Sequence, residues 1–342
     1  EENRVEAGGA LAVDRVAFAA AITGALEGHE NIEIVHEELT EIPAGPAIIA
    51  TGPLTSDSMA EAISKFFGGA QGLNFYDAAA PLVSFESLDK GTADYINCAM
   101  DKEQYQSFVR ELAGAEEAAV HGFEDKKVFE GCMPVEVMAR RGEDTLRYGP
   151  LKPVGLKDPK TGKEPYAVVQ LRKDNRSGTV YNIVGFQTHL RWPEQKRVFS
   201  MIPALAHAEY LRYGVMHRNT YLDSPRMLDR YYRARKAPDI AFAGQMTGVE
   251  GYIESTASGY LAAVEMGRTI LGLPAVDFPT YTAIGALASY ISDERVVKFQ
   301  PMNINFGIID PLDYKFKGKK HDRYLEVSRR ALAAIDEIRT RL

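Results

Sequence analysis

The sequence is poor in the residues and patterns that mark secreted, membrane and metal-binding proteins. Only two of its 342 residues are cysteines, Cys98 and Cys132, which excludes a disulfide scaffold and favours a reducing, cytoplasmic compartment. No apolar run approaches the roughly 18 residues of a membrane-spanning helix, and no signal-peptide pattern is visible, so we expect no membrane contact. Cysteine and histidine do not follow the spacing of a zinc site, and we expect no metal.

Acidic and basic residues are unevenly distributed along the chain, whose formal net charge is −7. The charge balance is −17 over residues 1–139, +11 over residues 140–236 and −1 over residues 237–342. A basic segment within an acidic protein is typical of a polyanion-binding surface, because clustered Lys and Arg supply phosphate contacts. A solvated basic face without a partner has the same composition and stays an alternative.

The order of predicted elements indicates an α/β protein with an insertion. Helix-like and strand-like segments open the chain, among them the apolar strand 46–52. Short strand-like runs follow, separated by turns rich in Gly, Pro and Lys, and from Asp239 helices alternate with strands again. We predict two parts of one α/β domain, residues 1–115 and 224–342, around an inserted α+β domain that is rich in strands, residues 116–223.

The stretch from Ile240 to Gly267 contains the most informative local pattern. An apolar strand is followed by a turn with Gly244 and Gly248, and then by apolar residues at helical spacing. A strand, a glycine turn and a helix N-terminus bring unpaired backbone N–H groups and a positive helix dipole to one point, which suits a phosphate or a reduced flavin. A tight connection without a ligand is equally compatible with the pattern.

Two further residues are candidates for chemistry. Cys132 lies between Gly131 and Pro134, so a turn presents its thiol, and nearby arginines would favour the thiolate. A buried structural cysteine is the commoner situation, and we favour it for Cys98. His189 precedes the only tryptophan, Trp192, and could stack with it on a planar heterocycle; an exposed turn is as compatible.

Eight motifs resemble the folate- and FAD-dependent tRNA (uracil-5-)-methyltransferases, and they follow one another in the order of that family. Because they span nearly the whole chain, the resemblance is highly specific. The motifs are residues 8–15 (GGALAVDR), 50–57 (ATGPLTSD), 129–134 (FEGCMP), 149–156 (GPLKPVGL), 185–190 (GFQTHL), 212–220 (RYGVMHRNT), 244–252 (GQMTGVEGY) and 299–307 (FQPMNINFG).

The resemblance implies a glutathione-reductase-like, Rossmann-type FAD-binding domain and a specific reaction. FAD would take a methylene group from methylenetetrahydrofolate and pass it to C5 of a T-loop uridine in tRNA, with NAD(P)H as reductant. Cys132 would be one of two functional cysteines, His189 would stack on the pterin and Tyr252 would lie at the flavin–folate site. By the same matching, the FAD-binding residues would be Thr51, Gly52, Gly244, Gln245, Thr247, Gly248, Val249 and Asn305.

The sequence departs from the family pattern at its beginning. Family members open with a strand, a G-x-G-x-x-G turn and a helix, and that motif does not occur in this sequence. We therefore expect the first βαβ unit to be absent, and FAD to be held weakly or not at all by these residues alone. Catalysis by them alone is left open.

Two other functions are compatible with parts of the sequence. A related FAD-dependent enzyme that modifies a tRNA wobble uridine is disfavoured by the motifs at 129–134 and 299–307. A non-catalytic RNA-binding remnant would also explain the departure at the beginning of the chain.

The basic segment 140–236 should bind RNA mainly through charge. Because each neutralised phosphate releases counterions, six phosphate contacts would weaken tRNA binding by roughly 10³-fold between about 50 and 200 mM salt. Filter binding across a salt series measures this slope. A dissociation constant that barely changes over the series would contradict the assignment.

Overall fold

The computed structural model describes residues 2–5, 11–69, 73–88, 95–118, 133–158, 162–175, 177–297 and 299–342. The chain forms two compact units, each built from two stretches of sequence. Unit 1 contains Glu1–Glu37 and Tyr76–His217, and unit 2 contains Glu38–Phe75 and Arg218–Leu342. The strands β4 (Leu73–Ala78) and β10 (Met216–Tyr221) pair in a two-stranded sheet where the chain passes between the units.

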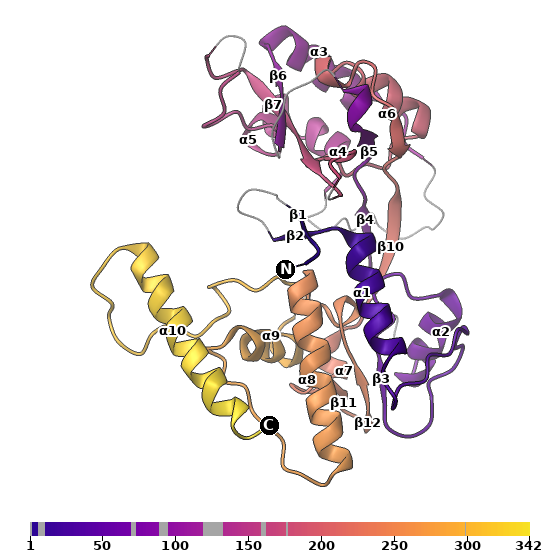
Figure 1. Cartoon of the computed structure of the whole chain (residues 1–342), viewed down its shortest axis with the longest axis vertical. Coiled ribbons are helices and arrows are strands. Elements are labelled where there is room, and N and C mark those ends of the chain that lie inside the picture. Colours follow the sequence, from indigo (N-terminus) through magenta and orange to yellow (C-terminus); the bar gives the residue numbers. More distant parts are fainter. Residues whose placement is uncertain are drawn as a thin grey trace. The chain divides into compact units, whose positions relative to one another are not determined.

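Unit 1 is organised around a five-stranded antiparallel sheet with the strand order β6-β7-β8-β5-β9. Its helices are α1, α3, α4, α5 and α6, and α3 contacts both α4 and α6 (Figure 1). The bounds in this unit are β1 (Arg4–Val5), β2 (Ala12–Val13), α1 (Arg15–Glu27), β5 (Leu82–Ser84), β6 (Tyr95–Met100), α3 (Lys102–Gly114), α4 (Val135–Arg140), α5 (Thr145–Tyr148), β7 (Ala167–Lys173), β8 (Val180–Ile183), α6 (Trp192–Phe199) and β9 (Tyr210–Arg212), with short 3₁₀ turns at Phe85–Ser87 and Pro203–Leu205.

The core of unit 1 forms where α3 covers the sheet. Asp101 and Gln104 close a capping box at the start of α3, which satisfies two backbone N–H groups that the helix itself leaves unpaired. On β6, alternate side chains are buried, as the two-residue period of a strand requires, and Cys98 is one of them. Burial raises the pKa of the Cys98 thiol to about 12, so it is an inert core residue, as predicted.

Unit 2 contains a three-stranded sheet, order β11-β12-β3, in which β12 and β3 are parallel. Helix α8 packs on β12 and contacts α9 (Figure 1). The bounds in this unit are β3 (Ala47–Ile49), α2 (Asp57–Phe66), α7 (Ser224–Met227), β11 (Arg233–Ala234), β12 (Ala237–Phe242), a 3₁₀ turn η4 (Gln245–Thr247), α8 (Tyr252–Ile270), α9 (Ala283–Ser292) and α10 (Lys320–Arg339).

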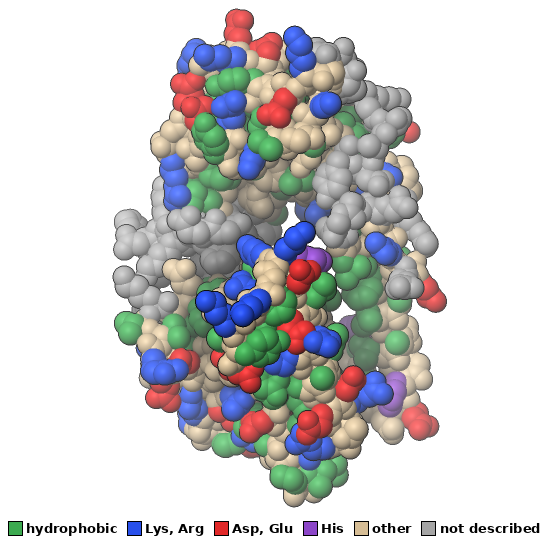
Figure 2. Space-filling model, turned by 90° about the vertical axis from the view of Figure 1, so that its left-hand side faces the viewer, with side chains coloured by type: hydrophobic (Ala, Val, Ile, Leu, Met, Phe, Trp, Pro, Cys, Tyr) green, Lys and Arg blue, Asp and Glu red, His purple; other side chains and the backbone are tan. Residues whose placement is uncertain are grey.

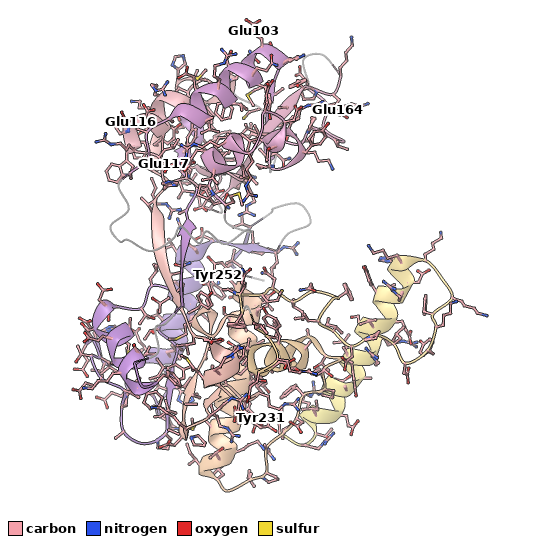
Figure 3. All side chains as sticks on the ribbon, turned by 180° about the vertical axis from the view of Figure 1, so that it is seen from behind. Glu103, Glu116, Glu117, Glu164, Tyr231 and Tyr252 are labelled. Atoms are coloured by element: carbon pink, nitrogen blue, oxygen red, sulfur yellow. The ribbon has the colours of Figure 1, made fainter. Side chains whose placement is uncertain are left out.

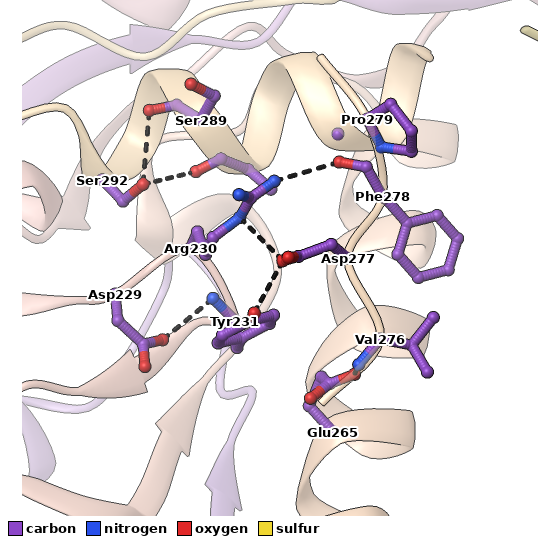
Figure 4. Close-up of polar contacts among 12 residues, drawn as sticks. Asp229, Arg230, Tyr231, Glu265, Val276, Asp277, Phe278, Pro279, Ser289 and Ser292 are labelled. Carbon is purple, nitrogen blue, oxygen red and sulfur yellow. Dashed lines mark hydrogen bonds and ion pairs between the residues drawn. The ribbon is translucent and has the colours of Figure 1, made fainter. Parts of the chain in front are cut away.

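A polar network fastens the segment after α8 to the turn before β11 (Figure 4). The Tyr231 hydroxyl donates to Asp277 Oδ1 at 2.6 Å, and Arg230 Nε lies 3.5 Å from the same oxygen. From α8, the buried Glu265 accepts the backbone N–H of Val276 at 2.8 Å. These contacts fasten the chain over the helix end: Glu265 Oε1 accepts the Val276 N–H, whereas the buried Oε2 of the same carboxyl has no hydrogen-bond partner among the described residues.

A group of exposed cations lies just before helix α10 and in its first turn, outside the basic segment that the composition identifies. Figure 2 shows Lys and Arg side chains gathered at the start of this helix. The exposed residues of this group are Lys315, Lys317, Lys319, Lys320 and Arg323. Within the described part of the chain, no helix combines the length and apolar character that crossing a bilayer requires.

The predicted elements and the observed ones agree closely in type. The apolar strand expected at 46–52 contains β3, and the strand, glycine turn and helix expected at 240–267 are β12, η4 and α8. The predicted domain boundaries, after residues 115 and 223, stay a prediction. The compact units divide the chain elsewhere: β6 and α3 belong to unit 1, because β6 pairs along its whole length with β7.

Candidate functional site

Two groups of predicted FAD-binding residues, Thr51–Gly52 and the turn that begins at Gly244, lie at one edge of the parallel sheet of unit 2. Ile240, Ala241 and Phe242 on β12 lie opposite Ala47, Ile48 and Ile49 on β3. The backbone N–H of Ala243 donates to Ile49 O at 2.9 Å, which extends the pairing to the strand ends. Two turns therefore leave the sheet side by side, one at Thr51–Gly52 and one at Gly244–Gln245. Ligands of open α/β sheets bind outside the carboxyl ends of such strands.

Both turns depend on glycine. Gly52 has φ +77° and Gly244 has φ +80°, a left-handed conformation that other residues rarely adopt. A Cβ atom added at either position would meet no atom within 4 Å, so the backbone faces open space there. The Thr55 hydroxyl donates to Gly52 O at 2.7 Å, and the exposed Thr51 hydroxyl lies 2.7 Å from that of Thr55.

Hydrogen bonds within the protein hold the Gly244 turn in its conformation. Gly244 donates its N–H to Ser258 Oγ on α8 at 2.8 Å, and its carbonyl accepts both the backbone N–H and the hydroxyl of Thr247. The Gln245 side chain donates to the two carboxylate oxygens of Glu250 at 2.8 and 2.9 Å. These hydrogen bonds order the turn without a ligand, because its polar groups already have partners within the protein.

Gly248 and Val249 join this edge to the chain segment that contains Asn305. Val249 forms a parallel bridge with Met302, and Met302 donates its N–H to Gly248 O at 2.9 Å. Gly248 has φ +84°, and an added Cβ would lie 2.3 Å from Phe299 Cζ, so the aromatic ring packs directly on its backbone. Asn305 is exposed, and its Oδ1 accepts the N–H of Gly307 at 2.8 Å.

Helix α8 begins at the same edge. Its first residue, Tyr252, is 92% exposed (Figure 3). Gly251 caps the helix with φ +107° and provides no side-chain acceptor, while Glu254 in the first turn accepts the N–H of Ile304 at 3.3 Å. The nineteen-residue helix passes the Gly244 turn in its second turn, where Ser258 Oγ accepts the Gly244 N–H.

The other predicted residue that the structure describes, His189, lies in unit 1 and is buried between two carboxylates. His189 Nε2 lies 2.6 Å from Glu117 Oε2, and Nδ1 lies 2.7 Å from Glu136 Oε1. Glu136 is itself fully buried; it accepts the Thr188 hydroxyl at 2.8 Å and the His189 backbone N–H at 3.0 Å. Arg140 forms a further ion pair with Glu117.

This geometry favours a charged imidazolium. Burial by itself lowers the pKa of His189, but contact with Glu136 and Glu117 raises it by more, so the net pKa is raised. For Glu117, burial raises the pKa while Arg140 and His189 lower it by more, and the net pKa is lowered. The three side chains could also offer ligand atoms to a metal. Because each imidazole nitrogen already faces a carboxylate, we interpret the group as an ion-pair cluster.

The ion-pair cluster ties three segments of unit 1 together. Gln187 O accepts the N–H of Val135 at the start of α4, and His189 O accepts the N–H of Ala118, both at 2.8 Å. With a ring only 5% exposed, His189 is a structural link in this arrangement, and its predicted stacking on a pterin stays a prediction. Sequence reasoning missed Glu117 and Glu136, because an isolated Glu in a helix or turn has no local pattern that marks a buried partner.

The structure places the remaining predicted residues in two groups. Thr51, Gly52, Tyr252, Asn305 and the turn 244–249 belong to unit 2, and His189 belongs to unit 1. Cys132 lies outside the described residues. The roles assigned to all of these residues stay predictions.

Comparison with known proteins agrees with this architecture. Residues 2–274 match the GIDA family, described as Glucose inhibited division protein A. Two structures of Aquifex aeolicus GidA are similar in fold, with TM-scores of 0.62 and 0.68 at 12% identity. They cover 82% and 95% of this chain, and the chain spans 52% and 61% of theirs. The class is thus an α/β protein of the GIDA family, and the predicted α/β, Rossmann-type fold is confirmed.

More similar relatives identify one family within this class. Proteins named methylenetetrahydrofolate--tRNA-(uracil-5-)-methyltransferase TrmFO from Lactobacillus johnsonii and Acetivibrio thermocellus are each 55% identical to the chain. Each alignment covers 98% of this chain and 79% of the relative. The chain belongs to this TrmFO family, as its motifs predict.

Gly248→Ala should lower the unfolding midpoint in denaturant more than Gly272→Ala does. Both glycines have positive φ, +84° and +68°, so both variants lose about 1 kcal/mol or more to backbone strain. Only at Gly248 does the new Cβ collide with Phe299, which adds roughly 1–3 kcal/mol. Equal losses, measured by circular dichroism, would contradict the packing of Phe299 on Gly248.

The ion-pair cluster should make the stability of unit 1 depend on pH. Because the folded pKa of His189 is raised, its contribution is complete below the usual value of 6.5 and is lost as pH rises through the folded pKa. His189→Gln should therefore show a flatter decline in unfolding midpoint above pH 6.5 than the unchanged chain. His207→Gln, at an exposed histidine of the same unit, is the control. Identical pH slopes for all three proteins would refute the charged state of His189.

Proposed function

We propose that this chain takes part in the FAD- and methylenetetrahydrofolate-dependent methylation of C5 of a uridine in the T arm of tRNA. The observation that supports the proposal is the parallel pairing of β3 and β12, which brings the predicted residues Thr51 and Gly52 next to the turn that begins at Gly244. The names of the relatives support the same reaction. NAD(P)H is the proposed reductant, and the cytoplasm is the proposed compartment.

The strand edge of unit 2 fits the charged part of FAD. Gly52 and Gly244 leave open space where a side chain would stand, so a diphosphate can approach the backbone. Helix α8, which is bonded to Gly244 through Ser258, would add the positive end of its dipole. When bound, the flavin would supply the redox chemistry, and Gln245, Thr247, Val249 and Asn305 would line its surroundings.

The uracil base must be activated before C5 can react, and a side chain of this protein would activate it. C5 of uracil is a poor nucleophile until a thiolate adds to C6, and Cys132 is the candidate thiolate. The transferred carbon is at the methylene level, so loss of the C5 proton would have to be joined by gain of a hydride, supplied ultimately by NAD(P)H, before departure of the thiolate restores the ring with a methyl group at C5. Tyr252, which is 92% exposed, is available to a planar partner at the flavin edge. The His189 ring would face the pterin only after leaving the carboxylates that hold it.

Neither alternative has a specific observation in its favour. Fold similarity to GidA at 12% identity does not support action on a wobble uridine, whereas 55% identity over 98% of the chain supports the uracil-5 reaction. A non-catalytic RNA-binding protein would bind tRNA and transfer no methyl group, so an activity measurement separates it from the proposal.

In the chain joined to an amino-terminal G-x-G-x-x-G unit and supplied with FAD, methylenetetrahydrofolate and NAD(P)H, Cys132→Ala should abolish 5-methyluridine formation in tRNA. Serine should rescue little, because its hydroxyl is scarcely ionised at neutral pH. Binding of tRNA should stay within about twofold, since one thiol adds little to contacts dominated by phosphates.

Cys98→Ala is the matched control for this experiment. It should cost stability, because Cys98 is buried in the core, and leave the methylation rate per folded molecule unchanged. Near-normal methylation by Cys132→Ala would end the catalytic role of that residue. Absence of methylation by the chain joined to that unit and without a substitution, with tRNA and FAD still bound, would favour the non-catalytic alternative.

A further inference from the structure

Three aromatic rings of unit 1 form a continuous stack that ends at the surface. The rings of Tyr210 and Tyr213 have centroids 5.1 Å apart and planes within 6° of each other. The ring of Trp192 continues the stack, 5.6 Å from Tyr213 and within 12° of parallel. Tyr210 and Tyr213 are partly covered, whereas Trp192 is 59% exposed. An indole with that exposure contributes little to the core. Packing in the core therefore does not account for a large aromatic residue at the exposed end of the stack.

The stack is held rigidly by a buried amide. The Gln195 side chain, with no exposed surface, donates to Leu190 O at 2.7 Å and to Gly214 O at 2.8 Å. Its Oε1 accepts the N–H of Gly214 at 2.8 Å. Helix α6, which carries Trp192, is thereby locked to the strand end that carries Tyr213. The close approach requires glycine, since a Cβ at Gly214 would lie 2.5 Å from Thr188 Cγ2.

The charges around Trp192 are of two kinds. Arg191 pairs with Glu116, and Arg197 pairs with Glu111 and Glu194, so these two cations are neutralised. Lys196 lies one helical turn after Trp192 on α6, and Arg212 directly precedes Tyr213. Both are exposed, and among the described residues neither forms an ion pair.

We propose that the exposed face of Trp192 is a stacking platform for an unpaired base of RNA, with Lys196 and Arg212 beside it for the flanking phosphates. Every base has a π face, and proteins that hold single-stranded nucleic acid combine aromatic rings with cations in this way. A base paired within a duplex is already stacked on its neighbours, so the platform selects a loop or a displaced strand. The inference rests on the proposed function only in taking the RNA to be tRNA.

Because Trp192 is the only tryptophan of the chain, its fluorescence reports the contact directly. A single-stranded RNA oligonucleotide, titrated into the chain without added flavin, should quench the emission. The same oligonucleotide annealed into a duplex should bind through charge with little quenching, and so should inorganic polyphosphate, which has no bases. Equal quenching by single strand, duplex and polyphosphate, or quenching by none of them, would overturn the proposal.

Variants provide a second readout, the dissociation constant of the labelled single strand. Trp192→Ala should weaken binding roughly 5- to 150-fold, the range that corresponds to one stacked base, and Trp192→Phe should recover most of the loss. Lys196→Ala should weaken single strand and duplex alike. Tyr148→Ala, at another exposed aromatic of unit 1 (74% exposed), is the matched control and should change neither constant.

These measurements separate the platform from the methylation reaction. Base-dependent quenching in a chain that, joined to an amino-terminal G-x-G-x-x-G unit and with FAD bound, methylates no tRNA would support the platform and refute the proposed function. Unchanged single-strand affinity in Trp192→Ala, with an unfolding midpoint equal to that of the unchanged chain, would overturn the platform even if methylation proceeds.

Discussion

The arrangement of unit 1 depends on the burial of one imidazole between two carboxylates. Glu136 on α4 and Glu117 after α3 approach His189 from two sides, and a buried charge is stable only when it is paired. Removing either carboxylate would leave charge uncompensated in a nearly dry site. Helix α6 begins at Trp192, three residues after His189, so the ion-pair cluster also fixes the position of the start of this helix.

In unit 2 the corresponding constraint is backbone conformation. Parallel pairing of β3 and β12 brings two chain turns to one edge, and left-handed glycines let both turns leave it without a side chain in the way. Hydrogen bonds that Gly244 and Gln245 donate to Ser258 and Glu250 then hold the second turn in place. A site prepared in this manner loses little entropy on binding, because its polar groups are already ordered.

The sequence predicts the local pattern in unit 2 but not the buried polar residues of unit 1. The strand, glycine turn and helix at 240–267 show a local pattern, and the structure has β12, η4 and α8 there. Glu117, Glu136 and Gln195 have no such pattern, since a single buried polar residue looks the same in sequence as an exposed one. The Trp192 stack also required the structure, because Tyr210 and Tyr213 lie on another element.

The sequence by itself determined the family, the α/β class and the type of most elements, since motifs, glycine positions and hydrophobic periods are local properties of the chain. Tertiary structure alone decided which segments share a unit, that His189 is enclosed rather than presented, and that Trp192 is the exposed end of a stack. Those outcomes depend on hydrogen bonds and packing between residues far apart in sequence, such as Glu117 with His189 and Gln195 with Gly214, and no local pattern encodes which distant groups will meet.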